Sequence, residues 1–298
     1  MATATAATTA ETSAPPPAIR KQRRFTLPTV SLWAGIALIS LYCLAPFYWM
    51  FVSSLKPSNA ILNNELWPSS ISFENYKSVF GEQNNFLYAL RNSLIIASLA
   101  TLLAMVVGVF AAYALARLQF RGKFLVLAAV LATAMFPGVA IVTPLFQLFS
   151  NLGWIDKYQS MIIPDISFTL PLAIWILTSF FAEMPWELEQ AAKVDGCTPG
   201  KAFRLVILPL AAPGVFTTAI LVFIYAWNEY LIASVMSQTQ ASAPVTVAIA
   251  KFTGDSQFQQ PFGTQMAAGV VVTIPLVILV LLFQRRIVAG LTAGGVKG

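Results

Sequence analysis

Residues Trp186–Pro209 read W-E-L-E-Q-A-A-K-V-D-G-C-T-P-G-K-A-F-R-L-V-I-L-P. This segment lies between two long apolar runs and carries charges of both signs, although only 10% of the chain is charged. Pro185 suits the first position of a helix, and Gly196 suits a left-handed helix end. Thr198 then suits an N-cap, with Pro199 at the first position of the next helix. The segment therefore predicts a short surface helix, a turn and an amphipathic helix that leads into the next apolar run.

The composition around this segment is that of a protein that crosses a membrane several times. The chain has 298 residues, of which 57% are hydrophobic, and its mean hydropathy is +0.73. A soluble domain carries about 25% charged residues, well above the value found here. The net charge of +6 is explained by basic residues held on one side of a membrane, so we expect no nucleic-acid partner.

Several kinds of chemistry are excluded by missing residues. The chain has no histidine, which removes Ser-His-Asp triads and His-ligated metal sites. Its two cysteines, Cys43 and Cys197, are predicted at different depths and lack the spacing of a zinc site. No phosphate-binding G-x-x-x-x-G-K-[ST] loop occurs, since Gly122-Lys123 is followed by Phe and Gly200-Lys201 by Ala. We therefore expect no cofactor and no ATP site in this chain.

The apolar runs predict an all-α protein with six transmembrane helices. Residues 1–28 form an Ala/Thr/Pro-rich leader that is predicted to be disordered. The membrane domain is predicted over residues 29–288, with the charged loop at 185–209 and a C-terminal tail at 289–298. The six predicted spans are Ser31–Ser53, Asn92–Ala116, Phe124–Phe149 (interrupted by Pro137 and Pro144), Gln159–Ala182, Leu210–Val235 and Met266–Phe283.

The distribution of basic residues predicts the orientation. Six spans place both termini on one side, together with the charged loop. That side carries all but five of the 18 Lys and Arg residues, which makes it cytoplasmic by the positive-inside rule. The five on the other side are Lys56, Lys77, Arg91, Lys157 and Lys251.

Three polar residues fall inside the apolar runs. Asn228 and Glu229 lie in the fifth predicted span, within Y-A-W-N-E-Y, and either line a translocation path or form a structural hydrogen-bonded pair near the outer helix end. We favour the structural interpretation, because polar groups far from the middle of a span are less costly. Asp165 follows Pro164 near the outer end of the fourth predicted span, where we expect a solvated helix end.

The charged loop resembles the EAA loop of ABC-importer permeases, which reads E-A-A-x-x-x-G-x9-I-x-L-P. Here Gln190, Ala191, Ala192 and Gly196 match its first part, and Val206, Leu208 and Pro209 its last. Gln190 replaces the usual Glu, and Val206 the usual Ile. In that family the loop is a coupling helix that docks into a cleft of an ATPase subunit. The resemblance therefore implies ATPase-coupling roles for Glu187, Glu189, Gln190, Ala191, Ala192, Asp195 and Gly196.

The resemblance extends over nearly the whole chain from Leu32. It is strongest to the second permease of maltose-type sugar importers, above all to the mycobacterial trehalose-importer permeases, and rests on these further segments: Asn92–Leu94, Ala111–Arg117, Met135–Pro137, Leu170–Trp175, Ala226–Glu229 and the tail from Phe283. It implies a non-catalytic subunit of a disaccharide importer in a bacterial cell membrane. The implied partners are a second permease, two subunits that bind ATP and Mg²⁺, and an extracellular sugar-binding lipoprotein.

Three alternatives remain open on the residues alone. The loop could be an ordinary cytoplasmic connection packed on its own bundle. The chain could be a self-contained secondary sugar carrier or channel, but such proteins need intramembrane charges and often an internal repeat, and neither is evident. An intramembrane enzyme is disfavoured because histidine and paired intramembrane carboxylates are missing.

Overall fold

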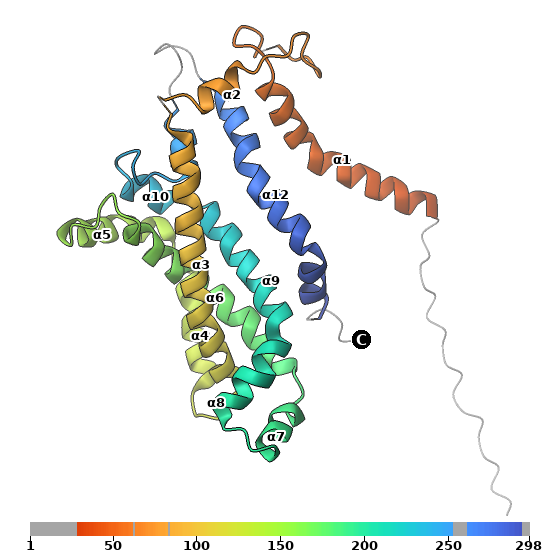
Figure 1. Ribbon diagram of the computed structural model, residues 1–298, viewed down its shortest axis with the longest axis vertical. Coiled ribbons are helices and arrows are strands. Elements are labelled where there is room, and N and C mark those ends of the chain that lie inside the picture. Colours follow the sequence, from red (N-terminus) through yellow and green to blue (C-terminus); the bar gives the residue numbers. More distant parts are fainter. Residues whose placement is uncertain (1–28, 62, 83, 253–260, 294–298) are drawn as a thin grey trace, which may run out of the picture. The chain divides into compact units, whose positions relative to one another are not determined.

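The computed structural model describes residues 29–61, 63–82, 84–252 and 261–293, with the backbone alone from residue 285 onward. All regular elements in these ranges are helical, as predicted (Figure 1). The predicted leader (residues 1–28) and the end of the predicted tail (residues 294–298) lie outside the described residues. The chain divides into two compact units, Met1–Pro46 and Phe47–Gly298, and helix α1 (Thr29–Ser54) runs across their boundary.

Within the described ranges, five helices are long and apolar enough to cross a membrane. They are α1, α3 (Phe86–Arg117), α6 (Gln159–Glu183), the continuous run Pro199–Trp227 and α12 (Phe262–Ala293). The first, second, fourth and sixth predicted spans are thus confirmed, although α3 begins earlier than expected and the helical backbone of α12 continues past Phe283.

The third predicted span is not one straight helix. It forms α4 (Lys123–Ala134) and α5 (Gly138–Asn151), and their axes differ by 86°. The break lies at Pro137, which has an extended backbone and restricts the residue before it. Pro144 lies inside α5 without ending it. The bent pair makes a sixth span only if both halves are counted together.

The fifth predicted span is wrong at its outer end. The run from Pro199 consists of α8 (Pro199–Ala202), a π-helical segment η1 (Phe203–Ile207) and α9 (Leu208–Trp227), and it ends before Val235. Asn228 is the C-cap of α9, and a separate helix α10 (Leu231–Met236) follows. Asn228 and Glu229 therefore lie at a break between two helices and not inside a span.

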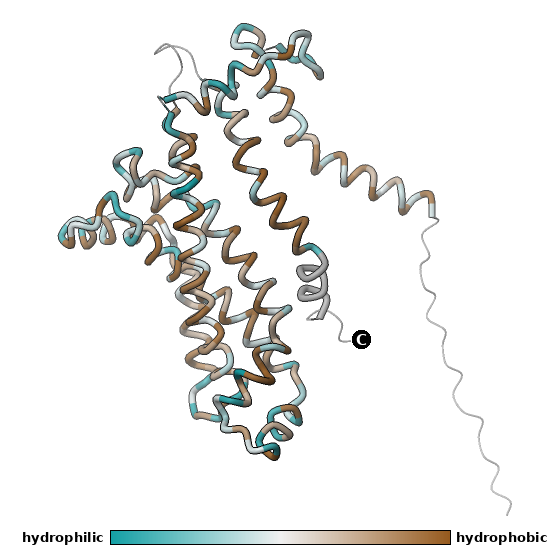
Figure 2. Tube along the Cα trace, in the orientation of Figure 1, coloured by the Kyte–Doolittle hydropathy of each residue, from teal (hydrophilic) through white to brown (hydrophobic). Residues whose placement is uncertain are grey.

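Three further helices are short and lie at the ends of the second unit. They are α2 (Glu74–Val79), α7 (Glu187–Val194) and α11 (Val245–Ala250). Figure 1 shows α2 at one end of this unit and α7 and α8 at the opposite end. Figure 2 shows hydrophilic residues gathered around α7 and α8, beyond the brown, hydrophobic stretches of α3 and α9. The charged loop is thus set apart from the apolar body of its own unit.

Helix α3 packs closely against α6 and α9 and forms the centre of this unit. Gly108 allows the closest approach, because a Cβ atom there would lie 3.3 Å from the Cβ of Ala173 on α6. Ala104 and Ala112 on the same side of α3 are fully buried. These small residues therefore let α3 and α6 approach closely, as small residues permit between helices in membranes.

Candidate functional site

Helix α7 exposes one face and buries the other. Four of its exposed residues, Glu187, Gln190, Ala191 and Val194, have a spacing of three, four and seven that places them on one side of the helix. Val194 is 86% exposed, an unusual position for a branched apolar side chain. We call these four residues the outer face of α7. This face therefore combines a charged, an amide and two apolar side chains.

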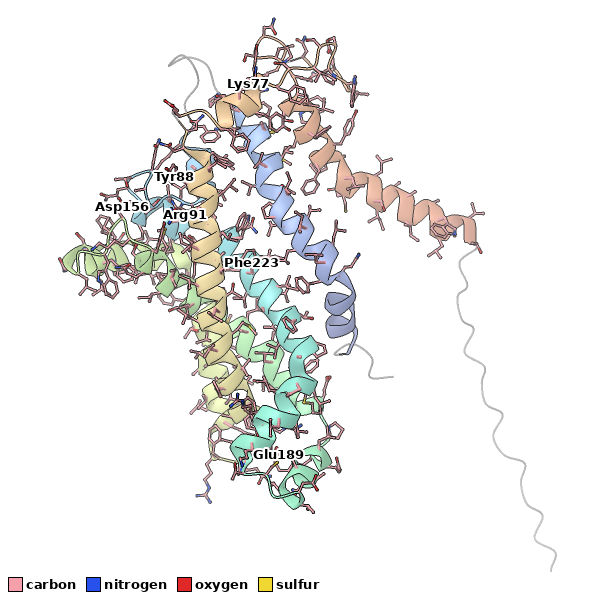
Figure 3. The ribbon with its side chains drawn as sticks, viewed as in Figure 1. Lys77, Tyr88, Arg91, Asp156, Glu189 and Phe223 are labelled. Atoms are coloured by element: carbon pink, nitrogen blue, oxygen red, sulfur yellow. The ribbon has the colours of Figure 1, made fainter. Side chains whose placement is uncertain are left out.

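The opposite face of α7 holds the helix to its own bundle. Glu189 and Ala192 are only 4% and 5% exposed. Glu189 pairs with Lys193 one turn later at 3.2 Å, and its carboxylate lies near the hydroxyl of Tyr113 on α3. Figure 3 shows Glu189 at the α7 end of the helical unit. Of the predicted coupling residues, Glu189 and Ala192 thus point inward, whereas Glu187, Gln190 and Ala191 point outward.

Arg117, the last residue of α3, contacts both the end of α6 and the residue before α7. Its Nη2 atom donates to the carbonyl oxygen of Met184, 2.8 Å away, at the end of α6. Its guanidinium carbon lies 5.4 Å from the ring centroid of Trp186, directly before α7. Sequence reasoning counted Arg117 only as a positive charge and a motif position. Its partners are a backbone carbonyl and a ring about 67 residues away, which no sequence spacing reveals.

The turn after α7 has the geometry that the sequence predicts. Gly196 adopts a positive φ of +83°, and the next residue, Cys197, donates its N–H to Ala192 at 2.9 Å. Gly196 itself donates to Lys193 at 3.1 Å, so both bonds of a Schellman ending are present. Thr198 then caps α8 by accepting from the N–H of Lys201 at 3.4 Å. Asp195 and Gly196 are both exposed at this turn.

Beyond α8, the π-helical segment η1 links the loop to the long helix α9. Leu208 donates its N–H to the carbonyl of Phe203, five residues earlier, directly before Pro209. Pro209 has no N–H and excludes a regular α-helical bond at this point, which accounts for the wider turn. The ring of Phe203 packs on Tyr113 of α3 at 4.5 Å between centroids. The helix that leaves the loop is thus anchored on the same part of α3 as α7.

The predicted polar pair Asn228–Glu229 is not a pair. Asn228 is exposed and donates to the carbonyl of Ile224 at 2.7 Å. The Glu229 carboxylate instead accepts from the backbone N–H groups of Ile232 and Ala233, at 2.7 and 2.9 Å, and so begins α10. The structural interpretation holds for Glu229 in this form, because its carboxylate satisfies the free N–H groups of a helix start.

Asp165 is not the solvated helix end that we expected. It is only 1% exposed and lines a small cavity with Glu229 and Ser93. The reason is that this part of α6 packs against α3 and α10, which cover Asp165. The sequence could not reveal this neighbour, because the break at Glu229 was hidden inside an apolar run.

At the end of this unit that holds α2, Asp156 joins two connections. Its carboxylate accepts from the N–H groups of Gln238 and Thr239, at 3.1 and 3.0 Å, and from the hydroxyls of Thr239 and Ser242. Partial burial acts to raise the pKa of Asp156, but these hydrogen bonds outweigh it and the pKa is lowered overall. The side chain therefore fixes the α5–α6 turn to the loop after α10 (Figure 3).

No cluster of three or more His, Cys, Asp or Glu side chains suited to a metal ion occurs within the described part of the chain. The geometry there offers an anchored, exposed helix at one end of a membrane bundle and a hydrogen-bonded polar cap at the other.

Comparison with known proteins identifies the family. Residues 83–292 match the family model described as the binding-protein-dependent transport system inner membrane component. The chain is 51% identical to the trehalose transport system permease protein SugB of Mycobacterium tuberculosis, over 89% of this chain and 97% of that protein. It is 42% identical to the trehalose/maltose transport system permease protein MalG of Thermococcus litoralis, over 93% and 99% of the two chains.

A solved structure shares the fold. It is a bacterial ABC transporter involved in the import of the acidic polysaccharide alginate, with a TM-score of 0.71 at 22% identity, covering 86% of this chain and 95% of that chain. The region that matches the family model, residues 83–292, includes every helix from α3 to α11 and most of α12. The chain therefore belongs to the family of inner-membrane components of binding-protein-dependent transport systems, the ABC-importer permeases.

Proposed function

We propose that this chain is a transmembrane permease subunit of an ATP-driven importer for a disaccharide, and that the disaccharide is trehalose. The 51% identity to a trehalose permease and the 42% identity to a trehalose/maltose permease support this sugar. The chain itself binds no ATP in this proposal, because it lacks the phosphate-binding loop. ATP and Mg²⁺ are bound by partner subunits.

The observation that carries the proposal is the two-sided character of α7. Its outer face (Glu187, Gln190, Ala191 and Val194) is free to meet an ATPase subunit, while Glu189 and Ala192 hold the helix to the bundle. Force applied to the outer face passes through Arg117 and Tyr113 to α3, and through η1 to α9. Asp195 and Gly196 complete the docking surface at the exposed turn. Closure of the ATPase pair thereby tilts the helical bundle as a rigid body.

The assembly that we propose contains a second permease, two ATP-binding subunits and an extracellular sugar-binding lipoprotein. A solved bacterial alginate ABC transporter of the same fold, with a TM-score of 0.64, was captured with a pentasaccharide-bound periplasmic protein. The exposed apolar residues of α3, such as Leu103, Val107 and Phe110, are suited to lipid or to the second permease. The charged loop and both termini face the cytoplasm in this arrangement.

Of the two polar residues predicted on the sugar path, Asn228 is the better candidate. It is exposed beside a helix break and uses its amide nitrogen to donate to Ile224, whereas both Glu229 oxygens accept backbone N–H groups. Asn228 is thus available to bind a sugar hydroxyl, and Glu229 acts mainly to shape the break.

The proposal is tested by uptake into lipid vesicles that contain the whole complex. With ATP inside the vesicles and binding protein outside, labelled trehalose should accumulate, and unlabelled trehalose should compete better than unlabelled maltose. A vesicle without ATP is the matched control. Uptake that continues without ATP would contradict the importer mechanism, while ATP-dependent uptake of maltose but not trehalose would contradict only the sugar.

A further inference from the structure

A small cavity lies between α3, α6 and the α9–α10 break. Its lining includes Ser93 of α3, Asp165 of α6 and Glu229 of the break, with the rest apolar. The cavity has a volume of about 10 Å³, which is enough for about one water molecule. Two carboxyl groups thus share one very small buried space in a membrane protein.

No basic side chain lines this cavity. Within the described part of the chain, Tyr225 of α9 is a further titratable group that interacts with both carboxyls, and a tyrosine is neutral at ordinary pH. The hydroxyl of Ser93 accepts from the backbone N–H of Val245 at 2.9 Å. Two negative charges here would repel each other with no cation to offset them, and such a pair loses one charge by taking up a proton.

The two carboxyls have different surroundings. Both oxygens of Glu229 accept backbone N–H groups, at 2.7 Å from Ile232 and 2.9 Å from Ala233, and hydrogen bonds of this kind favour the ionised form. Asp165 is 1% exposed, and its Oδ1 atom has no hydrogen-bond partner. An ionised carboxylate without donors is strongly disfavoured in such a place, whereas a neutral carboxyl is tolerated. The surroundings therefore assign the charge to Glu229.

We propose that Asp165 and Glu229 form a proton-binding pair, in which one proton resides on Asp165 while Glu229 stays ionised. The Asp165 carboxyl then becomes a donor whose O–H points into the shared cavity. Neutral Asp165 allows α6 to pack against α3 and the α9–α10 break without two facing charges. Two carboxyls with different surroundings commonly divide the neutral and the ionised role in this way.

Infrared spectroscopy of the purified complex tests the proposal directly. A neutral carboxyl has a C=O stretching band separate from those of carboxylates and amides, and an ester-free detergent keeps this region clear. At neutral pH, the difference between wild type and Asp165→Asn should contain one neutral-carboxyl band per permease chain. Glu74→Gln on α2 is the matched control, since this exposed carboxyl lies outside the cavity and its spectrum should lose no such band.

The position of the proton is tested by Glu229→Gln. The neutral-carboxyl band should persist in this variant and be lost only in Asp165→Asn. Persistence in Asp165→Asn with loss in Glu229→Gln would place the proton on Glu229 and overturn the assignment. If Asp165→Asn fails to fold, the spectrum of the wild-type complex alone tests the proposal. Absence of the neutral-carboxyl band at neutral pH would then overturn it.

A bound cation is the competing way to neutralise the pair. It predicts no neutral-carboxyl band in the wild type, together with a rise in melting temperature on adding NaCl or CaCl₂ that the Asp165→Asn variant lacks. That result would overturn the proton-binding proposal in favour of a metal ion. A wild-type band that is insensitive to both salts supports the proton.

Discussion

At the scale of single residues, burial separates neighbours that the sequence leaves equivalent. Glu189 and Gln190 are adjacent in the coupling motif, yet Glu189 is buried against α3 and Gln190 is exposed. The carboxylate that could have replaced the usual Glu of the motif therefore points away from any docking partner. The outer face of α7 keeps Gln190 as its central polar group, so under the proposed coupling role an ATPase subunit would meet an amide at the position where the EAA motif has Glu.

Replacing Asp156 by alanine should destabilise the end of the protein that holds α2. The substitution removes a charged acceptor of four hydrogen bonds and leaves the N–H groups of Gln238 and Thr239 unpaired. Hydrogen bonds to charged groups each stabilise by about 1.5–3 kcal/mol, and partial exposure reduces this, so we expect a loss of about 2 kcal/mol. The melting temperature of the purified complex measures it.

The same residue predicts a pH dependence. Because the pKa of Asp156 in the folded protein is lowered, its stabilisation is fully present above the ordinary pKa of about 3.9 and is lost as the pH falls through the lower folded value. The gap in melting temperature between wild type and Asp156→Asn should therefore stay constant from neutral pH to about pH 4. A gap that already closes near pH 6 would contradict the lowered pKa.

Gly196→Ala should be destabilising through the backbone alone. The φ angle of +83° is unfavourable for any residue with a Cβ, by about 1–2 kcal/mol, although no atom lies within 4 Å of the new methyl group. Gly200→Ala is the matched control, because that helical glycine also has open space and no positive φ. We expect a lower melting temperature only for Gly196→Ala, and equal effects would show that the left-handed turn is not maintained.

At the scale of elements, adjacent alanines on α7 should behave oppositely. Ala191→Trp places a large ring on the outer face and should block association with the ATPase subunit while the melting temperature of the free permease stays unchanged. Ala192→Trp forces the ring into the buried side and should destabilise the fold itself. Co-purification measures the association with the ATPase subunit, and thermal unfolding measures the stability of the permease. If Ala191→Trp leaves the ATPase bound, the outer face is not the docking surface.

The end of α7 and the start of α8 were predictable from sequence because caps are local, whereas α7 begins at Glu187 and not at Pro185. Gly196, Thr198 and Pro199 act within a few residues of themselves, and each has the predicted role. The break after Trp227 was not predictable, since no Gly or Pro marks it and side-chain bonds from Asn228 and Glu229 create it. The bend of 86° at Pro137 was anticipated as an interruption but not in its size, which depends on the packing of α4 and α5 on separate neighbours.

At the scale of the whole molecule, the family and the helical class followed from motif and composition, whereas the buried site between Asp165 and Glu229 did not. Those two residues are far apart in sequence and meet only because α6 and the α9–α10 break pack together. Arg117 likewise acts through distant partners, Met184 and Trp186. Long-range contacts of this kind leave no periodic pattern in a single sequence.

The predicted orientation is tested by labelling in intact cells. With Cys43 and Cys197 replaced by serine, Lys77→Cys on α2 should react with a thiol reagent that does not cross the membrane, and Lys201→Cys on α8 should not. Both positions are exposed in the protein itself, so a difference in labelling reports the membrane and not burial. After the cells are broken open, both should react. Labelling of Lys201→Cys in intact cells would invert the topology.

The central claim is that the outer face of α7 docks on a separate subunit that hydrolyses ATP. The most direct measurement is photo-crosslinking from Val194, replaced by benzoylphenylalanine, in membranes that contain the full transport complex. The account predicts an adduct with the ATP-binding subunit and none from the same probe at Tyr88, an exposed position at the opposite end of α3 (Figure 3). An adduct from Tyr88 but not from Val194, or no ATPase adduct from either position, would contradict it.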